Sequence, residues 1–376
     1  MAARPAAAIV GTGFVAALHV DALRRLGIEV VGVVGSSRER GAAAGLGEAY
    51  ASLDELLADD RVDVVHVTTP NDLHRPQVEL ALEAGKHVVC EKPLALTAAE
   101  SAELLARAEA VGVVHCTNFN ARFYAHVQHT RALVRDGGLG ELWNVHGVYL
   151  QDWLLRPTDW NWRLDPARGG ALRAIGDIGS HWLDLVQFVT GQSIVELLAD
   201  LRTVLPVRRR PKGPVQTFAA ADAEGEDVAI ATEDLGHVLL RFDGGASGSL
   251  VVSQVSAGRK NMLAFELDGS RAALAWSSER AEELWLGHRG RPNELLTRDP
   301  SLLDPAAGEP TSLPAGHAEG FADTFRELYR RVYGAVEAGG PPATPDYPTF
   351  ADGHRENVLA DAIGRSSRER RWIEVA

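Results

Sequence analysis

The chain has 376 residues, which is more than one hydrophobic core usually spans, so we expect two domains. Its formal net charge of −13 argues against a nucleic acid or an anionic membrane as a partner, because both select a concentrated basic surface. No apolar stretch is long enough to span a membrane, and the Ala-rich start lacks the long apolar segment of a signal peptide. The two cysteines, Cys90 and Cys116, lie in apolar runs, so the sequence predicts neither a disulfide framework nor a metal site, and we expect a cytoplasmic protein.

The first third of the chain alternates short apolar runs with helical patterns. Near-continuous apolar strands separated by helices indicate a parallel sheet covered on both faces, the doubly wound α/β arrangement. Thr97 and Glu100 form a capping-box pattern, and Gly27, Gly85 and Gly112 stand where helices are expected to end. The predicted strands are residues 7–10, 30–34, 62–68, 87–90 and 113–117, and the predicted helices are residues 16–26, 38–45, 53–58, 74–84 and 97–110.

After residue 121 the pattern changes to longer strands with hairpin turns. The clearest hairpin joins residues 235–242 to 246–256 through Asp243-Gly244-Gly245. Strands in series, with helices elsewhere in the sequence, predict an α+β domain with a mainly antiparallel open sheet and helices on one face. We therefore divide the chain into residues 1–121 and residues 122–376. The further predicted elements are helices at 122–135, 177–189, 320–338 and 350–365, strands at 142–150, 261–268, 272–276 and 371–375, and an irregular excursion at 206–232.

The chain opens with a strand, a G-x-G-x-x-A turn and a helix. In this arrangement the first glycine permits a tight turn, the second lets the backbone approach a pyrophosphate, and the helix N-terminus faces the phosphates. A Gly-rich turn alone has little specificity, but this one follows a strand and begins a series of strand–helix repeats, so residues 1–121 are predicted to be a dinucleotide-binding Rossmann domain. The predicted contacts are Gly11, Thr12, Gly13, Phe14 and Val15, and Ala16 is expected to allow close packing of helix and strand.

The end of the second strand bears on the choice between NAD and NADP. An acidic residue there would bind the ribose 2′-hydroxyl and repel a 2′-phosphate. The sequence has Ser36, Ser37 and Arg38 instead, and two hydroxyls with a guanidinium suit a phosphate better than a diol. We therefore expect NAD or NADP as the cofactor and favour NADP, with a solvent-facing helix position as the alternative for Arg38.

Three further segments carry acidic, basic and amide side chains. Residues 69–74 follow a predicted strand and read TPNDLH, residues 90–94 end the next strand and read CEKPL, and residues 176–184 open a helix and read GDIGSHWLD. Together with the G-x-G-x-x-A turn, this set resembles the Gfo/Idh/MocA family (glucose–fructose oxidoreductase, inositol dehydrogenase and relatives) over almost the whole chain. The runs at 149–153 and 211–214 resemble most its sugar-oxidising members, such as levoglucosan dehydrogenases.

The resemblance implies a reactive centre of Lys92, Asp177 and His181. A group that titrates near neutrality best removes the hydroxyl proton as hydride leaves a secondary alcohol, which favours His181. Asp177 lies four residues before His181, so one helix would present both on one face and the carboxylate would orient the imidazole. Lys92 is expected at the C-terminal edge of a parallel strand, where its ammonium would stabilise negative charge on the substrate oxygen. Lys92 could itself be the acid/base, with His181 positioning the substrate. The plainer alternatives are that Asp177 and His181 are a surface pair or a satisfied core histidine, and that Lys92 is only a strand-end residue.

The resemblance also implies cofactor contacts from the two segments that follow strands. Asn71 and His74 are expected near the nicotinamide ribose, and Glu91 beside the ribose or the amide, with Thr69 and Lys92 in the same set. A capping or surface role for His74 is an equal alternative.

The Trp-rich segment at residues 151–170 indicates a carbohydrate, because sugar sites combine hydrogen-bonding groups with an apolar or aromatic surface. Residues 122–376 are therefore expected to bind a neutral pyranose, glycoside or cyclitol and to oxidise a ring secondary alcohol, with C3 chosen from relatedness alone. The turn at residues 258–261 is a further candidate, with a plain hairpin turn as its alternative. The predicted substrate contacts are Arg122, Gln151, Asp152, Trp153, Trp162, Arg163, Asp177, His181 and Asp184.

The main hypothesis is reversible hydride transfer between NAD(P) and a carbohydrate. One alternative is a glycosidase that retains its NAD and oxidises C3 transiently, and another is a non-catalytic protein that senses a dinucleotide. By analogy with relatives, we expect a homodimer or homotetramer formed through the open sheet of the second domain.

Overall fold

The computed structural model describes residues 4–213 and 224–375, and the chain divides into two compact units. Unit 1 consists of Met1–Asn120 and Phe321–Asn357, and unit 2 of Ala121–Gly320 and Val358–Ala376. The division proposed from the sequence differs from these units at Ala121, which belongs to unit 2, and at residues 321–357, which pack with the N-terminal part of the chain. The predicted excursion and the run at 211–214 both extend into residues 214–223, which lie outside the described residues. Within residues 4–213 and 224–375, no helix combines the length and the apolar character that crossing a membrane requires.

Unit 1 is built on a six-stranded parallel sheet in the order β3-β2-β1-β4-β5-β6. Strands β1 and β4 are buried along their whole length, as expected where both faces of a sheet are covered. The doubly wound prediction is confirmed, and the sheet has one more edge strand, β3, which sequence analysis missed because its three residues form no apolar run. The strands are β1 (Ala7–Val10), β2 (Val30–Val34), β3 (Glu48–Tyr50), β4 (Val64–Val67), β5 (His87–Cys90) and β6 (His115–Thr117).

The helices of unit 1 begin and end at residues suited to capping. Thr97 Oγ1 accepts a hydrogen bond from the backbone N–H of Glu100 at 3.2 Å, and the Glu100 carboxylate accepts one from the N–H of Leu96 at 3.1 Å. Gly112 ends its helix in the left-handed region, with φ +75°. The helices are α1 (Phe14–Arg25), α2 (Arg38–Ala44), α3 (Leu53–Leu57), η1 (Asn71–Leu73), α4 (His74–Glu83), α5 (Ala98–Val111) and α10 (Phe321–Glu337).

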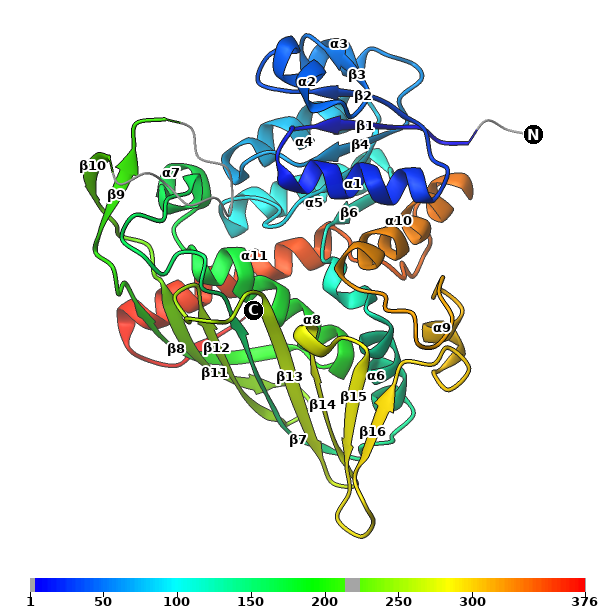
Figure 1. The fold of residues 1–376 in the computed structure, drawn as a ribbon, viewed down its shortest axis with the longest axis vertical. Coiled ribbons are helices and arrows are strands. Elements are labelled where there is room, and N and C mark those ends of the chain that lie inside the picture. Colours follow the sequence, from blue (N-terminus) through cyan, green and yellow to red (C-terminus); the bar gives the residue numbers. More distant parts are fainter. Residues whose placement is uncertain (1–3, 214–223, 376) are drawn as a thin grey trace. The chain divides into compact units, whose positions relative to one another are not determined.

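Helix α10 completes unit 1 from a distant part of the sequence. It lies beside α1 (Figure 1), where Arg25 pairs with Asp323 at 2.5 Å. Its buried face reaches the sheet, because the ring of Tyr329 packs edge-on against that of His66 on β4 with 4.9 Å between the centroids. The late helix thus covers the parallel sheet.

Unit 2 is built on a nine-stranded sheet in the order β16-β15-β14-β13-β7-β12-β11-β8-β17. Neighbouring strands are antiparallel except β7 and β12, which are parallel, so the predicted mainly antiparallel sheet is confirmed. A separate ribbon, β9 with β10, forms within the predicted excursion. The strands are β7 (Leu142–Leu150), β8 (Ile194–Arg202), β9 (Val207–Pro211), β10 (Gly225–Ala229), β11 (Leu235–Phe242), β12 (Ser247–Ser253), β13 (Met262–Gly269), β14 (Ala273–Ser277), β15 (Glu283–Gly287), β16 (Glu294–Thr297) and β17 (Ile373–Glu374).

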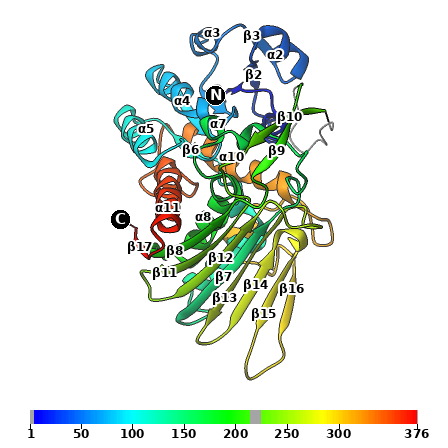
Figure 2. The same ribbon diagram turned by 90° about the vertical axis from the view of Figure 1, so that its left-hand side faces the viewer.

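Helices cover one face of this sheet (Figure 2). Trp182 on α8 is fully buried, and its indole N–H donates to the carbonyl of Ala264 on β13 at 2.9 Å. The C-terminal part of α11 packs on β8, where Ser366 Oγ accepts a hydrogen bond from the N–H of Ala199 at 2.9 Å. The helices are η2 (Asn120–Phe123), α6 (Ala125–Arg135), η3 (Trp162–Leu164), α7 (Pro166–Gly169), the π-helical turn η4 (Ile175–Gly179), α8 (Ser180–Thr190), η5 (Ser278–Arg280), α9 (Pro305–Gly308) and α11 (Phe350–Glu369); η2 and α11 each cross the division between the units.

Replacing Gly147 with Ala tests the packing of β7 beneath α8. An added Cβ would lie 2.1 Å from the Ala264 carbonyl oxygen and 2.5 Å from the indole nitrogen of Trp182, so the backbone must move. We expect the free energy of unfolding to fall by about 1–3 kcal/mol in chemical denaturation. Gly334→Ala is the control, because nothing lies within 4 Å of a Cβ added there and alanine favours the α10 helix. Equal stabilities of the two variants would contradict this packing.

Candidate active site

The turn between β1 and α1 has the shape that a pyrophosphate requires. Gly11 has φ +116°, and a Cβ there would lie 2.6 Å from Thr68 Oγ1, so only glycine fits. At Gly13, the N-cap of α1, nothing lies within 4 Å of an added Cβ, and no side chain caps the helix. Open space at such a helix N-terminus suits an anion, so the residues present fit a dinucleotide. Of the other predicted contacts, Thr12 and Val15 are half-buried and Phe14 is exposed, whereas Ala16 is buried between helix and strand.

The predicted ribose contacts Ser36, Ser37 and Arg38 follow β2 and are all exposed. Ser37 is the N-cap of α2, where its Oγ accepts a hydrogen bond from the N–H of Arg40 at 3.3 Å. The next acidic residue, Glu39, is exposed, and its hydrogen bond with Ser37 lowers the pKa of its carboxyl. The Ser37 hydroxyl therefore has a capping role, and the contacts of Ser36, Ser37 and Arg38 with a ribose or its phosphate stay predictions.

His74 lies buried between the loops that follow β4 and β5. Its Nε2 is 2.9 Å from the carbonyl oxygen of Thr69, and its Nδ1 is 2.7 Å from that of Pro93. Burial lowers the pKa of the imidazole, whose two nitrogens both face backbone. His74 therefore bridges the two loops rather than lying on the surface, and its contact with a cofactor stays a prediction. In the same segment, Thr69 Oγ1 donates to Gln77 Oε1 at 2.6 Å, and Asn71 is buried.

Glu91 and Lys92 follow β5, at the carboxyl end of the parallel sheet. The Glu91 carboxylate is directed into unit 1, where Oε1 lies 3.1 Å from His19 Nε2 and accepts from the Asn118 amide at 2.5 Å. Its Oε2 accepts the backbone N–H of Lys92 at 3.2 Å, and His19 contacts His66 through their Nδ1 atoms at 3.0 Å. The described contacts of Glu91 thus hold the backbone of half-buried Lys92, and the predicted contact with a ribose or amide stays a prediction.

Asp177 and His181 lie in one continuous helical run of unit 2, Asp177 in the π-helical turn η4 and His181 in the first turn of α8. Asp177 Oδ1 accepts a hydrogen bond from Arg163 Nε at 3.0 Å, and Oδ2 accepts one from Gln254 Nε2 at 2.9 Å. The ring centroid of His181 lies 6.2 Å from that of Tyr149. Each oxygen of Asp177 therefore has a donor that fixes the carboxylate one turn before His181.

The predicted substrate residues Gln151 and Trp153 are ordered by the turn at residues 258–261. Asn261 Oδ1 accepts from the Tyr149 hydroxyl at 2.9 Å and from Gln151 Nε2 at 2.7 Å. Gln151 Oε1 then accepts the indole N–H of Trp153 at 2.8 Å. This chain of hydrogen bonds fixes an amide, a phenol and an indole beside one another, which is the mixture that a sugar site needs.

The same turn also binds the carboxylate of Asp152. Its Oδ2 lies 2.7 Å from Lys260 Nζ and accepts the N–H of Gly258 at 3.0 Å. The hydrogen bond from Lys260 lowers the pKa of the Asp152 carboxyl. The turn thus holds the Trp-rich segment. It is not the plain hairpin turn that was the alternative, because β12 and β13, which it joins, each pair with β7 and not with each other. Its contact with substrate stays a prediction.

The predicted arginines are both paired with acids. The guanidinium of Arg163 lies over the ring of Trp162, 4.4 Å from its centroid, and reaches Asp177. Arg122 forms a two-pronged, buried ion pair with Asp184, with 2.8 Å from Nε to Oδ2. This pair joins η2 to α8, so Arg122 and Asp184 have a structural role, and their contacts with substrate stay predictions.

Sequence analysis assigned no role to Arg173 or Gln254, which contact the Asp177 region. Arg173 stands four residues before Asp177, a spacing that would have indicated a shared turn. Gln254 directly follows β12 and has no pattern of its own. Lys92 belongs to unit 1, and Asp177 and His181 to unit 2.

The sequence predicts no metal ligands. Among the described residues, His146, Glu266 and Asp268 bring three donor atoms within 4.8 Å of one another on the sheet of unit 2. All three side chains are half-buried, and His146 Nε2 lies 3.7 Å from Asp268 Oδ2. His146 Nε2 also lies 4.0 Å from Glu266 Oε2, so the three side chains lie beside one another.

Comparison with known proteins matches both parts of the chain. Residues 6–119 match a family model described as an oxidoreductase family with an NAD-binding Rossmann fold, and residues 127–275 match the GFO/IDH/MocA C-terminal domain. A levoglucosan dehydrogenase of Pseudarthrobacter phenanthrenivorans is 29% identical over 324 residues, which cover 85% of this chain and 82% of the relative.

Solved structures agree over the full length. An oxidoreductase domain protein from Kribbella flavida is 31% identical with a TM-score of 0.88, covering 99% of both chains. A levoglucosan dehydrogenase in complex with NADH and levoglucosan is 26% identical with a TM-score of 0.88, again covering 99% of both chains. The chain therefore belongs to the Gfo/Idh/MocA family of oxidoreductases, and its N-terminal part is the NAD-binding Rossmann fold of that family.

Proposed function

We propose that this oxidoreductase transfers hydride between a nicotinamide cofactor and a secondary alcohol on the ring of a sugar, glycoside or cyclitol. The observation that carries the proposal is Asp177, held through both carboxylate oxygens one helical turn before His181. A carboxyl group and an imidazole, one helical turn apart here, are two of the groups that general acid–base catalysis uses. The similarity to a levoglucosan dehydrogenase supports a carbohydrate as substrate.

The proposed chemistry assigns one task to each of three side chains. When bound, the nicotinamide supplies the acceptor or donor of hydride. His181 takes the hydroxyl proton in the direction of oxidation and returns it in reduction. Asp177 stabilises the protonated imidazole, and Lys92 donates a hydrogen bond to the oxygen on which negative charge develops. Lys92 as the acid/base, with His181 orienting the substrate, is the second arrangement that the same residues allow.

The polar chain around Gln151 supports a carbohydrate ligand. The Gln151 amide lies between Asn261 and the indole of Trp153, and Arg163 is stacked on Trp162. Rigid amide and guanidinium groups beside aromatic rings bind hydroxyl groups and the apolar face of a pyranose at the same time. Oxidation at C3 is proposed from relatedness to sugar-oxidising members of the family.

For the cofactor we propose a preference for NADP over NAD. The first residues after β2 are Gly35, Ser36, Ser37 and Arg38, so no carboxylate stands at the strand end to repel a 2′-phosphate. Ser36 and Arg38 are exposed, with a hydroxyl and a guanidinium that suit a phosphate.

For the oligomer we propose a homodimer or homotetramer formed through the sheet face of unit 2 that helices α8 and α11 do not cover. A depression on this face is lined by the apolar side chains of Trp285 and Leu295, the latter 56% exposed. Exposed apolar side chains of this kind favour contact with another subunit.

The most direct prediction concerns turnover with carbohydrates. Incubation of the protein with NAD or NADP and a panel of sugars, cyclitols and glycosides should produce reduced nicotinamide, measured by its absorbance. His181→Ala and Asp177→Asn should each lower kcat at least about 100-fold and leave the cofactor Kd within about twofold, because the groups act on the proton. The exposed His237→Ala is the matched control and should retain activity. Bond cleavage without net cofactor reduction would instead indicate a glycosidase, and tight cofactor binding without any turnover would indicate a sensor.

Gly13→Ala tests the phosphate-binding turn. The added methyl group enters open space, so the free energy of unfolding should fall by less than about 1 kcal/mol. Because the same space is needed by the pyrophosphate, the Kd for NADH and NADPH in calorimetric titration should rise at least about tenfold. Unchanged affinity in the folded variant would show that the pyrophosphate binds elsewhere.

Ser36→Asp tests the cofactor preference. The new carboxylate would bind a ribose diol and repel a 2′-phosphate, so the ratio of kcat/KM for NADP to that for NAD should fall at least about tenfold. Ser36→Asn, of the same size without the charge, should change this ratio much less. A wild-type protein that uses NAD better than NADP would contradict the proposed preference.

A further inference from the structure

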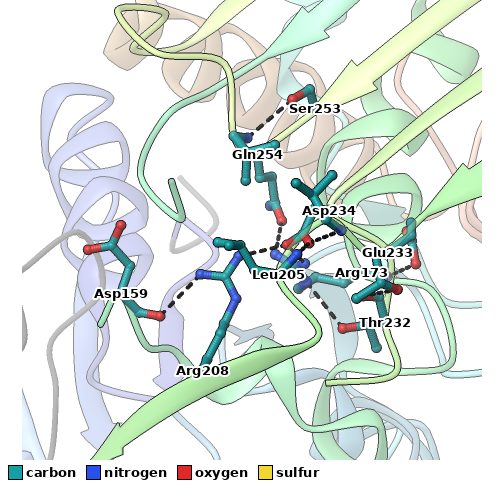
Figure 3. Close-up of polar contacts among 12 residues, drawn as sticks. Asp159, Arg173, Leu205, Arg208, Thr232, Glu233, Asp234, Ser253 and Gln254 are labelled. Carbon is teal, nitrogen blue, oxygen red and sulfur yellow. Dashed lines mark hydrogen bonds and ion pairs between the residues drawn. The ribbon is translucent and has the colours of Figure 1, made fainter. Parts of the chain in front are cut away.

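A buried polar cluster lies behind Asp177 in unit 2. We call it the Arg173 cluster; it consists of Arg173, Arg208, Thr232, Glu233, Asp234 and Gln254 (Figure 3), and each of these residues is at most 4% exposed. At its centre, Arg173 and Arg208 both donate to Asp234 Oδ1. The second oxygen of Asp234 accepts the backbone N–H groups of Val204 and Leu205 at 2.7 and 2.8 Å. One carboxylate therefore joins two cations and a loop.

The charged groups of the cluster are buried, so they interact with one another and with the backbone. Burial raises the pKa of Glu233, which accepts the backbone N–H groups of Arg173 and Ile175 at 3.0 and 2.9 Å. For Asp234, burial acts in the same direction, but the attraction of Arg173 and the hydrogen bonds lower its pKa overall. A buried charge that loses its partner is strongly destabilising, so these side chains have little freedom to move.

The guanidinium of Arg173 fixes the orientation of the Gln254 side chain. Arg173 Nη1 donates to Gln254 Oε1 at 3.0 Å, which turns the NH₂ group of the amide toward Asp177, where it donates to Oδ2 at 2.9 Å. The reverse orientation would place an NH₂ group against a guanidinium and an oxygen against a carboxylate. The position of the Asp177 oxygen is thus set by a cation that does not touch it.

Arg173 also holds the main chain of Asp177. Its carbonyl oxygen accepts the N–H of Asp177 at 2.7 Å, at the start of the π-helical turn. Such turns, inserted at the end of an α-helix, re-aim the side chains that they carry. Backbone and side chain of the acid are therefore both held by the same arginine.

We propose that Arg173 and Gln254 are positioning residues for the acid–base centre, which hold Asp177 as a hydrogen-bond-accepting carboxylate one helical turn before His181. This inference rests on the proposed function, because it assigns to Asp177 the role of the fixed acid. It adds how Oδ2 is held, which is by Arg173 acting through Gln254, whereas Arg163 holds Oδ1. Neither residue exchanges a proton with the substrate.

Gln254→Glu is the sharpest test. The substitution keeps the shape of the side chain and retains an acceptor for Arg173, but it places a carboxylate oxygen about 3 Å from Asp177 Oδ2. The two carboxylates cannot both be charged at that separation without repulsion, so a proton is bound between them at low pH. The acidic limb of the kcat/KM profile for sugar oxidation should move to higher pH by about one unit, with cofactor Kd unchanged.

Two further variants distinguish positioning from stability. Gln254→Met removes the donor to Asp177 and should lower kcat on the order of tenfold with a smaller effect on KM. Thr232→Val removes the acceptor of Arg173 Nε, 3.2 Å away, and leaves the contact of Arg173 Nη1 with Gln254 in place. It should lower the denaturation midpoint but leave the pH profile of the remaining folded enzyme unchanged.

The outcomes separate this inference from the proposed function. The proposed function and the positioning role are both supported if Asp177→Asn loses turnover, Gln254→Glu shifts the acidic limb, and Thr232→Val leaves the acidic limb unchanged. If Asp177→Asn loses turnover but Gln254→Glu and Gln254→Met keep the wild-type profile and kcat, the positioning role is wrong and the proposed function is unaffected. Full turnover of Asp177→Asn would overturn the proposed function itself.

Discussion

The ion pairs of Arg173 and Arg208 with Asp234 hold together the segments of unit 2 that surround Asp177. A carboxylate without exposure to solvent binds two guanidinium groups and two backbone amides, so the ends of β8, β9 and β11 and the turn before α8 share one electrostatic centre. Moving any of these groups would leave a buried charge without its partner. Gln254 connects Asp177, the acid proposed for catalysis, to this centre. The position of the Asp177 carboxylate therefore depends on the buried ion pairs of unit 2.

Unit 1 also holds its loops through buried polar side chains. His74 bridges the loops after β4 and β5, and the Glu91 carboxylate holds the backbone of Lys92 while its other oxygen faces His19 and Asn118. The carboxyl ends of parallel strands present loops at one edge of the sheet, where backbone groups need partners. In both units, buried polar side chains therefore hold the residues for which we propose a catalytic role, Lys92 in unit 1 and Asp177 in unit 2.

Much of the fold could be predicted from the sequence because its causes are local. Apolar runs, capping residues and the glycines at 11 and 13 act within a few positions, and the parallel sheet, its helices and the hairpin at 243–245 follow from them. Long-range contacts carry no such pattern. Helix α10 packs with α1 although about 300 positions separate them in the sequence, and Gln254 contacts Asp177 across 77 positions. Neither the inclusion of α10 in unit 1 nor the hydrogen bond from Gln254 to Asp177 could therefore be predicted from the sequence. Likewise, the spacing of Arg122 and Asp184 gave no sign of their pairing.

The central claim is that hydride passes directly between a carbohydrate carbon and the nicotinamide. Transfer of deuterium tests it most directly: a sugar that the enzyme oxidises is labelled at the reacting carbon, and the reduced cofactor is isolated and weighed by mass spectrometry. We expect one deuterium in each reduced nicotinamide, and at least about 100-fold less labelled cofactor from His181→Ala in the same time. Oxidation with unlabelled cofactor, or cleavage of a glycoside with the label returned to the sugar, would contradict it.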